Sequence, residues 1–195
     1  LQIGVQLLPT LFRDFKNLYP EIELEVVEAG GIDSLRMIEN EELDLAVTNY
    51  DDSFSPNLHY RKLFKSEACF CTYPDHPLAQ KKYVDTKDIA NEPLVLLNGG
   101  FFVNRLIYQN FQQALTAPKV ILHSSQLHTV KNLISSQIAS SFLMRQAITA
   151  SDNIIPLSLK KPLFINSGIV TKRGRQIYGD EQKLIEFICD NQPLG

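Results

Sequence analysis

The sequence lacks the features of several protein classes. No apolar run reaches the roughly 18 residues of a membrane-spanning helix. No basic and apolar leader with a small-residue cleavage site opens the chain. Lys and Arg number 19 against 22 Asp and Glu, and this net charge of -3 supplies no positive field for a phosphate backbone. We therefore expect a cytoplasmic protein that makes no membrane contact and does not hold DNA with these residues alone.

Cysteine is scarce as well. The three cysteines have no paired spacing, so they do not indicate a disulfide framework. Cys69 and Cys71 alternate on an expected strand over residues 68–73, which points their side chains to opposite faces and argues against a shared metal ion. Cys189 falls on an expected helix as a packing residue. We expect neither a metal site nor a cofactor.

The chain has enough apolar residues for a sizeable core. Hydrophobic residues make up 44% of 195, which suits one domain or two small lobes. Pro and Gly are spread along the sequence, so no linker stands out. Residue 1 is Leu and residues 1–5 resemble the interior of a strand, so we expect a fragment of a longer protein.

The opening residues alternate between short strands and helices. Pro9 suits a first helical turn, and apolar residues then recur at helical spacing. Apolar residues next alternate with glutamates, as in a strand with one wet face. This order predicts a parallel α/β sheet. The expected strands are residues 1–5, 22–26 and 43–47, and the expected helices are residues 8–19 and 32–39.

The remaining chain repeats this α/β pattern. An extended stretch over residues 58–73, broken near 65–67, leads into a Pro-rich turn. A second set of elements follows, so we expect two units of similar organisation. Its strands are residues 94–97, 120–123, 138–144, 154–157 and 164–171, and its helices are residues 85–90, 105–115, 127–135 and 181–190.

Polar residues follow the strands where ligands of parallel sheets bind. The first suspects are Gln6, Thr48 and Asn49. Helix starts have unpaired N–H groups and a positive dipole end, which suits a carboxylate or another anion. The residues before two expected helices are Asn98, Gly99 and Gly100, and Ser124, Ser125 and Gln126. The same residue types also cap helices and form turns in proteins that bind nothing there.

Several short motifs together resemble one family. The chain has a Tyr-Pro-Glu-Ile-Glu-Leu segment from Tyr19, Leu-Asp-Leu-Ala-Val from Leu43, Asp-His-Pro-Leu-Ala from Asp75, and Glu-Pro-Leu-Val-Leu from Glu92. In this order they resemble the effector-binding domain of LysR-type transcriptional regulators. The resemblance implies a two-lobed, type 2 periplasmic-binding-protein-like α/β fold with two crossover strands and an inter-lobe cleft. Lobe I would hold residues 1–65 and 165–195, and lobe II residues 66–164.

The resemblance also implies a function. A small effector, for which we expect an anion such as a carboxylate, would bind between the lobes and change DNA binding by an amino-terminal winged helix-turn-helix domain that this fragment lacks. It implies a homodimer, and a tetramer of the full-length protein. Residues 22–26 and 32–40 would pack against the partner near residues 120–123. DNA would be contacted only through the missing domain.

The chain departs from the family pattern in two places. Only Gln6 and Leu7 separate Val5 from Leu8, where the family has a longer Ser/Thr-containing loop. Either the connection is short or residues are unrecorded there. Residues 137–144 lack the family's glycines and proline, and Arg145 follows directly. Arg145 would pair with an acidic effector if it faces the cleft, and would be an ordinary solvated arginine if it points outward.

Two other functions stay open. A solute-binding protein shares the implied fold, and so does a small enzyme such as a prephenate-dehydratase-like domain. His123 precedes Ser124 and Ser125, but no acidic residue lies near in sequence to orient the imidazole, and no Gly-x-Ser-x-Gly motif occurs. We therefore expect no enzyme activity.

Overall fold

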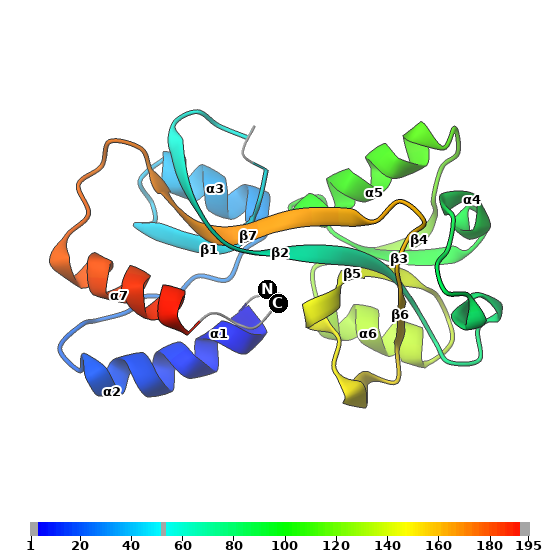
Figure 1. Ribbon diagram of the computed structural model, residues 1–195, viewed down its shortest axis with the longest axis horizontal. Coiled ribbons are helices and arrows are strands. Elements are labelled where there is room, and N and C mark those ends of the chain that lie inside the picture. Colours follow the sequence, from blue (N-terminus) through cyan, green and yellow to red (C-terminus); the bar gives the residue numbers. More distant parts are fainter. Residues whose placement is uncertain (1–3, 52–53, 192–195) are drawn as a thin grey trace. The chain divides into compact units, whose positions relative to one another are not determined.

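The computed structural model describes residues 4–51 and 54–191, and the chain divides into two compact units (Figure 1). The first unit comprises Leu1–Lys65 and Asn166–Gly195, and the second comprises Ser66–Ile165. Two strands, β2 (Leu58–Thr72) and β7 (Leu163–Lys172), cross from one unit to the other. The expected break in β2 near residues 65–67 is wrong, because the strand continues unbroken through them.

The sheet of the first unit is built on β1 (Leu45–Tyr50), which pairs with β7 in antiparallel register. The expected parallel pairing of this strand is therefore wrong among the described residues. β1 also begins and ends later than residues 43–47, because its ladder runs from Leu45 opposite Thr171 to Tyr50 opposite Asn166. β7 lies between β1 and β2 in the sheet.

The first helical stretch differs from its prediction. It runs through α1 (Gly4–Thr10), the π-helical turn η1 (Leu11–Phe15) and α2 (Lys16–Leu18). Residues 1–3 of the expected first strand lie outside the described residues, and Gly4 and Val5 are helical. Pro9 is inside α1 rather than in a first turn. A strand is stable only when it pairs with a neighbouring strand. Here the helix extends back to Gly4 in place of a strand.

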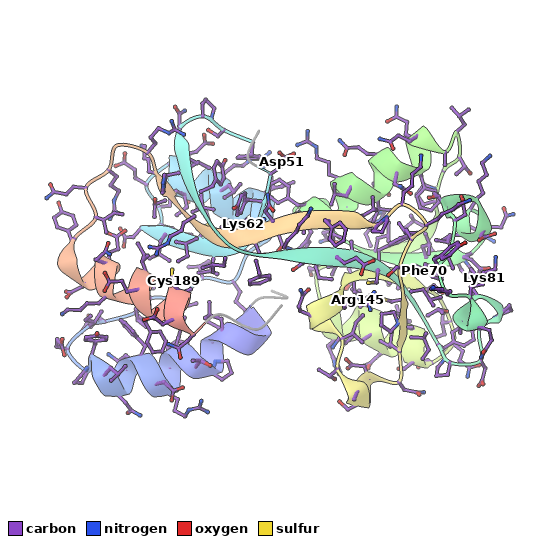
Figure 2. All side chains as sticks on the ribbon, viewed as in Figure 1. Asp51, Lys62, Phe70, Lys81, Arg145 and Cys189 are labelled. Carbon is purple, nitrogen blue, oxygen red and sulfur yellow. The ribbon has the colours of Figure 1, made fainter. Side chains whose placement is uncertain are left out.

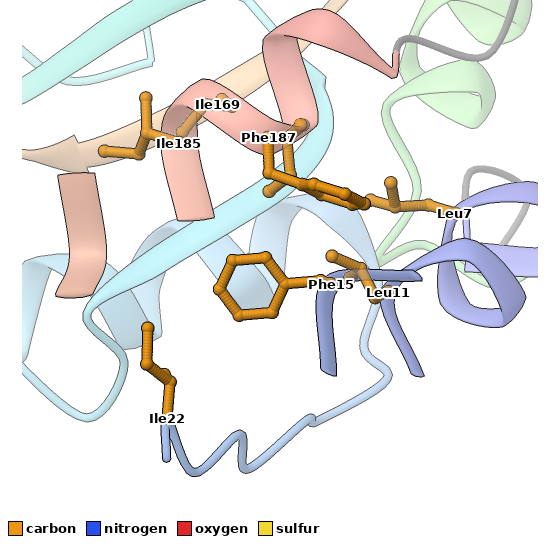
Figure 3. Close-up of a cluster of buried hydrophobic side chains, with 8 residues drawn as sticks. Leu7, Leu11, Phe15, Ile22, Ile169, Ile185 and Phe187 are labelled. Atoms are coloured by element: carbon orange, nitrogen blue, oxygen red, sulfur yellow. The ribbon is translucent and has the colours of Figure 1, made fainter. Parts of the chain in front are cut away.

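A hydrophobic cluster joins these helices to the sheet and to α7 (Gly179–Asp190) (Figure 3). Phe15 is fully buried, with its ring centroid 5.2 Å from that of Phe187 and 5.0 Å from that of Tyr19. The π turn changes the helical spacing, so Phe12 and Leu18 of the predicted apolar face are exposed. The buried members of the cluster are Leu7, Leu11, Phe15, Ile22, Ile169, Ile185, Phe187 and Ile188.

The helix α3 (Gly31–Glu39) confirms the prediction for this segment, with Leu35 and Ile38 fully buried. The expected strand over residues 22–26 is wrong. The segment is neither helix nor strand, and no ladder among residues 4–51 and 54–191 includes it. The glutamates alternate outward as predicted, since Glu21, Glu23 and Glu25 are exposed. Alternating polar and apolar residues indicate one solvent-exposed face and one buried face. A β-strand also requires backbone hydrogen bonds to a neighbouring strand.

The second unit confirms most predicted elements. The strands β3 (Pro93–Leu97) and β4 (Lys119–Ser124) pair in parallel, and α5 (Phe102–Gln113) and α6 (Leu127–Ser135) lie on opposite sides of them (Figure 1). β5 (Ser141–Met144) and β6 (Ile155–Leu157) each pair with β2 in antiparallel register. A short helix, α4 (Thr86–Ile89), starts at a capping box formed by Asp85 and Asp88.

The predicted Pro-rich turn is held by a histidine. His76 is buried, and its Nδ1 accepts a hydrogen bond from the Leu78 N–H at 3.1 Å. Its Nε2 lies 3.0 Å from Glu92 Oε2. His76 therefore has the structural role that its position in a turn predicts. Within the described ranges, no helix is both long and apolar enough to cross a bilayer.

Candidate functional site

The ends of β3 and β4 bring two predicted segments together. The last ladder pair sets Leu97 opposite Ser124, and the Asn98 N–H donates a hydrogen bond to the Ser124 carbonyl at 3.0 Å. The segment of Asn98, Gly99 and Gly100 therefore lies beside the segment of Ser124, Ser125 and Gln126. The parallel register causes this, because both strands end at one edge of the pair.

Each segment leads directly into a helix. The N-cap residues are Phe101 for α5 and Gln126 for α6, and neither makes a side-chain cap hydrogen bond. Asn98, Gly99, Ser125 and Gln126 are exposed to solvent. Two neighbouring helix amino termini without side-chain caps present N–H donors and positive dipole ends to solvent. This arrangement can hold the oxygen atoms of an anion.

Local hydrogen bonds occupy part of these side chains. Ser124 Oγ accepts a bond from the Gln126 N–H at 3.1 Å, and the Thr129 hydroxyl donates to Gln126 Oε1 at 3.1 Å. Ser124 thus has the turn role that the sequence left open for it. The exposed Ser125 hydroxyl and the Gln126 amide nitrogen are the more available donors of this segment.

In the first unit, Thr48 and Asn49 lie inside β1 rather than after it. Successive side chains of a strand point to opposite faces, so the two residues cannot both face one site. Thr48 is buried on the face shared with Ala46 and Tyr50. Asn49 is half-buried on the other face. Their side chains therefore lie on opposite faces of β1, because the strand runs further than its apolar residues indicate.

Asn49 has a partner that the sequence analysis missed. Ser167 lies directly opposite it on β7, and the Ser167 hydroxyl donates a hydrogen bond to Asn49 Oδ1 at 2.6 Å. The signal was a polar pair, Asn166 and Ser167, between the apolar residues Leu163–Ile165 and Ile169–Val170 of one strand. Gln6, the remaining candidate in this unit, lies inside α1, and its side chain is outside the described part of the chain.

Arg145 is held by an acidic residue of the chain itself. It follows β5 and begins a short 3-10 helix, Arg145–Ala147 (Figure 2). Its Nε and Nη2 donate to Glu67 Oε2 at 3.0 and 2.8 Å, and Nη2 also donates to Ser158 Oγ at 3.0 Å. Its guanidinium is therefore paired with Glu67, although the Arg145 side chain is still 44% exposed to solvent.

The pKa of Glu67 reflects this pairing. Burial opposes ionisation of the carboxyl, but hydrogen bonds from Ser158 and Arg145 and the positive charge of Arg145 outweigh it and lower the pKa. Because the folded-state pKa lies below that of the unfolded chain, the ionised Glu67 contributes stability above the unfolded value of about 4.5. That contribution is lost as the pH falls through the folded-state pKa.

Glu67→Gln is expected to lower the free energy of unfolding by about 1 kcal/mol at pH 7, since one charge-assisted interaction is lost at a partly exposed site. In acid, where Glu67 of the wild type is itself protonated, the two proteins should become equally stable. Urea unfolding across this pH range measures both. Glu23→Gln, at an exposed residue, is the control and should change little at any pH. A Glu67→Gln deficit that stays constant into acid would contradict the assignment.

The histidines and cysteines support no catalytic pair in the described part of the chain. His123 Nε2 lies 3.2 Å from the Tyr108 hydroxyl, and His128 Nε2 lies 3.0 Å from Asn132 Nδ2, so neither pairs with Ser124 or Ser125. Cys69 is buried, and burial raises the pKa of its thiol to about 12. Among the described residues, no group of three or more His, Cys, Asp or Glu could hold a metal ion.

Comparison with solved structures identifies the fold. The effector-binding domain of QuiR in complex with shikimate superposes with a TM-score of 0.80 at 20% identity, over 97% of this chain and 91% of that one. The regulatory domain of CcmR from Synechocystis PCC6803 in complex with 2-PG gives a TM-score of 0.88 at 18% identity, over 99% and 96%. These likenesses confirm the expected type 2 periplasmic-binding-protein-like α/β fold.

Sequence comparison identifies the family. The transcriptional dual regulator GltC of Bacillus subtilis (strain 168) is 26% identical over 195 residues, which cover 95% of this chain. The chain spans 63% of the length of GltC. The sequence profile of the family described as LysR substrate binding domain matches residues 2–192. This match extends over nearly the whole chain, which therefore belongs to the LysR substrate-binding domain family of transcriptional regulators.

Proposed function

We propose that this domain senses a small anionic metabolite and that the ends of β3 and β4 hold its acidic group. The observation that carries the proposal is the pair of helix amino termini, of α5 and α6, which lie beside each other without side-chain caps. Shikimate, the compound in the QuiR complex, is a carboxylate, and a carboxylate suits such donors. Asn49 of the first unit would supply a further donor. As the family resemblance implies, we propose that the effector binds between the two lobes.

The proposed mechanism is ligand-biased regulation. The effector changes an equilibrium between arrangements of the protein only by its different affinity for each. DNA would be bound by a helix-turn-helix domain outside this chain, in the cytoplasm. The regulatory domain would transmit this change in the equilibrium to the DNA-binding domain through contacts between protomers.

We further propose a homodimer of this domain and a tetramer of the full-length protein. Two exposed apolar surfaces support the homodimer. Val26 and Val27 are 41% and 47% exposed on the extended segment before α3, and Ile121 and Leu122 are 50% and 42% exposed on β4. These are the segments that the family pairs across the dimer. Water-exposed apolar surface of this kind is typical of protein interfaces.

Thermal-shift screening of carboxylate and phosphate metabolites, with shikimate included, tests the proposed function. A ligand at 100 times its Kd adds about 2.7 kcal/mol to the free energy of unfolding, which for a domain of this size raises Tm by about 5–10 °C. Gly100→Val, which adds a branched side chain directly before the N-cap residue of α5, should abolish the shift. Ser125→Ala should reduce it. Ser136→Ala, at the carboxyl end of α6, is the matched control and should keep it. A ligand that stabilises all three variants as well as the wild type would contradict the site.

A further inference from the structure

Asn49 and Ser167 are polar residues on an otherwise packed face of the first unit. They lie opposite each other on β1 and β7, one pair beyond Thr48 and Gly168. Two residues back along β1, Val47 lies opposite Ile169 and packs against the hydrophobic cluster. The two polar residues therefore continue the row of this apolar face, at the end of β1.

The hydrogen bond between them fixes how the Asn49 carboxamide is presented. Ser167 is fully buried, so its single O–H donor has no water to bind and is committed to Asn49 Oδ1 at 2.6 Å. Asn49 Nδ2 has no partner among residues 4–51 and 54–191, and it is not one of their buried unpartnered atoms. The oxygen of the carboxamide is thus engaged inside the protein, and its N–H groups reach solvent.

We propose that Ser167 is a positioning residue that holds Asn49 as a hydrogen-bond donor, so that the first unit selects a ligand group that accepts, a carboxylate or a carbonyl oxygen. The inference rests on the proposed function and adds the specificity of one subsite to it. A carboxamide can present either its oxygen or its nitrogen. Because Ser167 binds the oxygen, a ligand amine or ammonium group finds no acceptor at Asn49.

The experiment is an NMR titration of the 15N-labelled chain with sodium acetate as the carboxylate probe and sodium chloride at equal ionic strength as the salt control. The side-chain amide signal of Asn49 is assigned by its loss in Asn49→Asp. In the wild type, acetate should shift this signal and ammonium chloride should not. In Ser167→Ala, where the carboxamide is no longer anchored, we expect acetate to bind about 5-fold more weakly, as expected for loss of one hydrogen bond.

Two further variants keep the test decisive. Thr171→Val removes another buried hydroxyl from β7, opposite Leu45, and should leave the Asn49 response unchanged. Asn49→Asp keeps an acceptor for Ser167 but offers the ligand an oxygen, so a carboxylate found by thermal screening should stabilise this variant less than the wild type. Absence of an acetate shift at Asn49, or equal acetate affinity in Ser167→Ala, would overturn the inference. Acetate shifts at Gly99 and Gly100 in that case would leave the proposed function standing.

Discussion

Gly168→Ala is expected to lower the free energy of unfolding by about 3 kcal/mol, the upper end of the usual cost of overpacking. A Cβ at this position of β7 would lie 2.2 Å from the Arg61 carbonyl oxygen and 3.0 Å from Lys62 Cα of β2. These are backbone atoms, which no change of rotamer can move. The two crossover strands would have to separate in the first unit, which breaks their ladder. The midpoint and slope of urea unfolding measure the loss.

The control for this substitution is Gly179→Ala in the first turn of α7. A Cβ there meets no atom within 4 Å, so its effect should stay within about 0.5 kcal/mol. If both alanine variants were equally stable, β7 and β2 would not approach each other as closely as the structure shows. The Asn49–Ser167 pair, one position along β7, would then lack the frame that the further inference requires.

Phe15→Ala should cost about 3–5 kcal/mol, since it deletes a fully buried aromatic side chain. Phe15 lies at the centre of the cluster that joins the first helical stretch to α7, where its ring meets Phe187 edge-on (Figure 3). The cavity would open between elements that are far apart in sequence. Thermal and urea unfolding, read by circular dichroism, should show a large drop in stability without a change in the folded spectrum.

Phe12→Ala is the matched control, on the same helical stretch and with the same atoms removed. Phe12 is 55% exposed, so its truncation should cost less than about 1 kcal/mol. This pair of substitutions also tests the π turn. In a regular α-helix the residues that face the core recur with a different spacing, so the burial of Phe12 and Phe15 would differ. Equal costs for the two substitutions would show that the helical register differs from the one described.

The local sequence was sufficient to predict those helices and strands whose hydrophobic periodicity and flanking turn residues are both clear. The helix α6 begins and ends at its predicted residues, and α3 buries the predicted Leu35 and Ile38. The parallel pair of β3 and β4 also lies where short apolar runs bounded by turn residues indicated. Hydrophobic periodicity and the positions of turn residues are properties of residues close together in sequence, so they can be recognised without knowledge of the tertiary structure.

Several features that the sequence analysis did not predict depend on a distant partner. Residues 22–26 alternate as a strand does but have no ladder neighbour in the described part of the chain. The sequence analysis did not predict the ion pair of Arg145 with Glu67, because the two residues are far apart in sequence. Ser167 was not suspected at all, because its importance comes from the register that sets it opposite Asn49.

By itself, the sequence determined an α/β chain, the polar segments at the starts of α5 and α6, and a resemblance to LysR effector-binding domains, which implied two crossover strands. Only the tertiary structure decided which of these groups are available to a ligand. It paired β1 with β7, turned Thr48 and Asn49 to opposite faces, and committed the Arg145 guanidinium to Glu67. The physical reason is that these particular strand and ion pairs join residues more than 70 positions apart, such as the 78 between Glu67 and Arg145, and local patterns carry no information at that range.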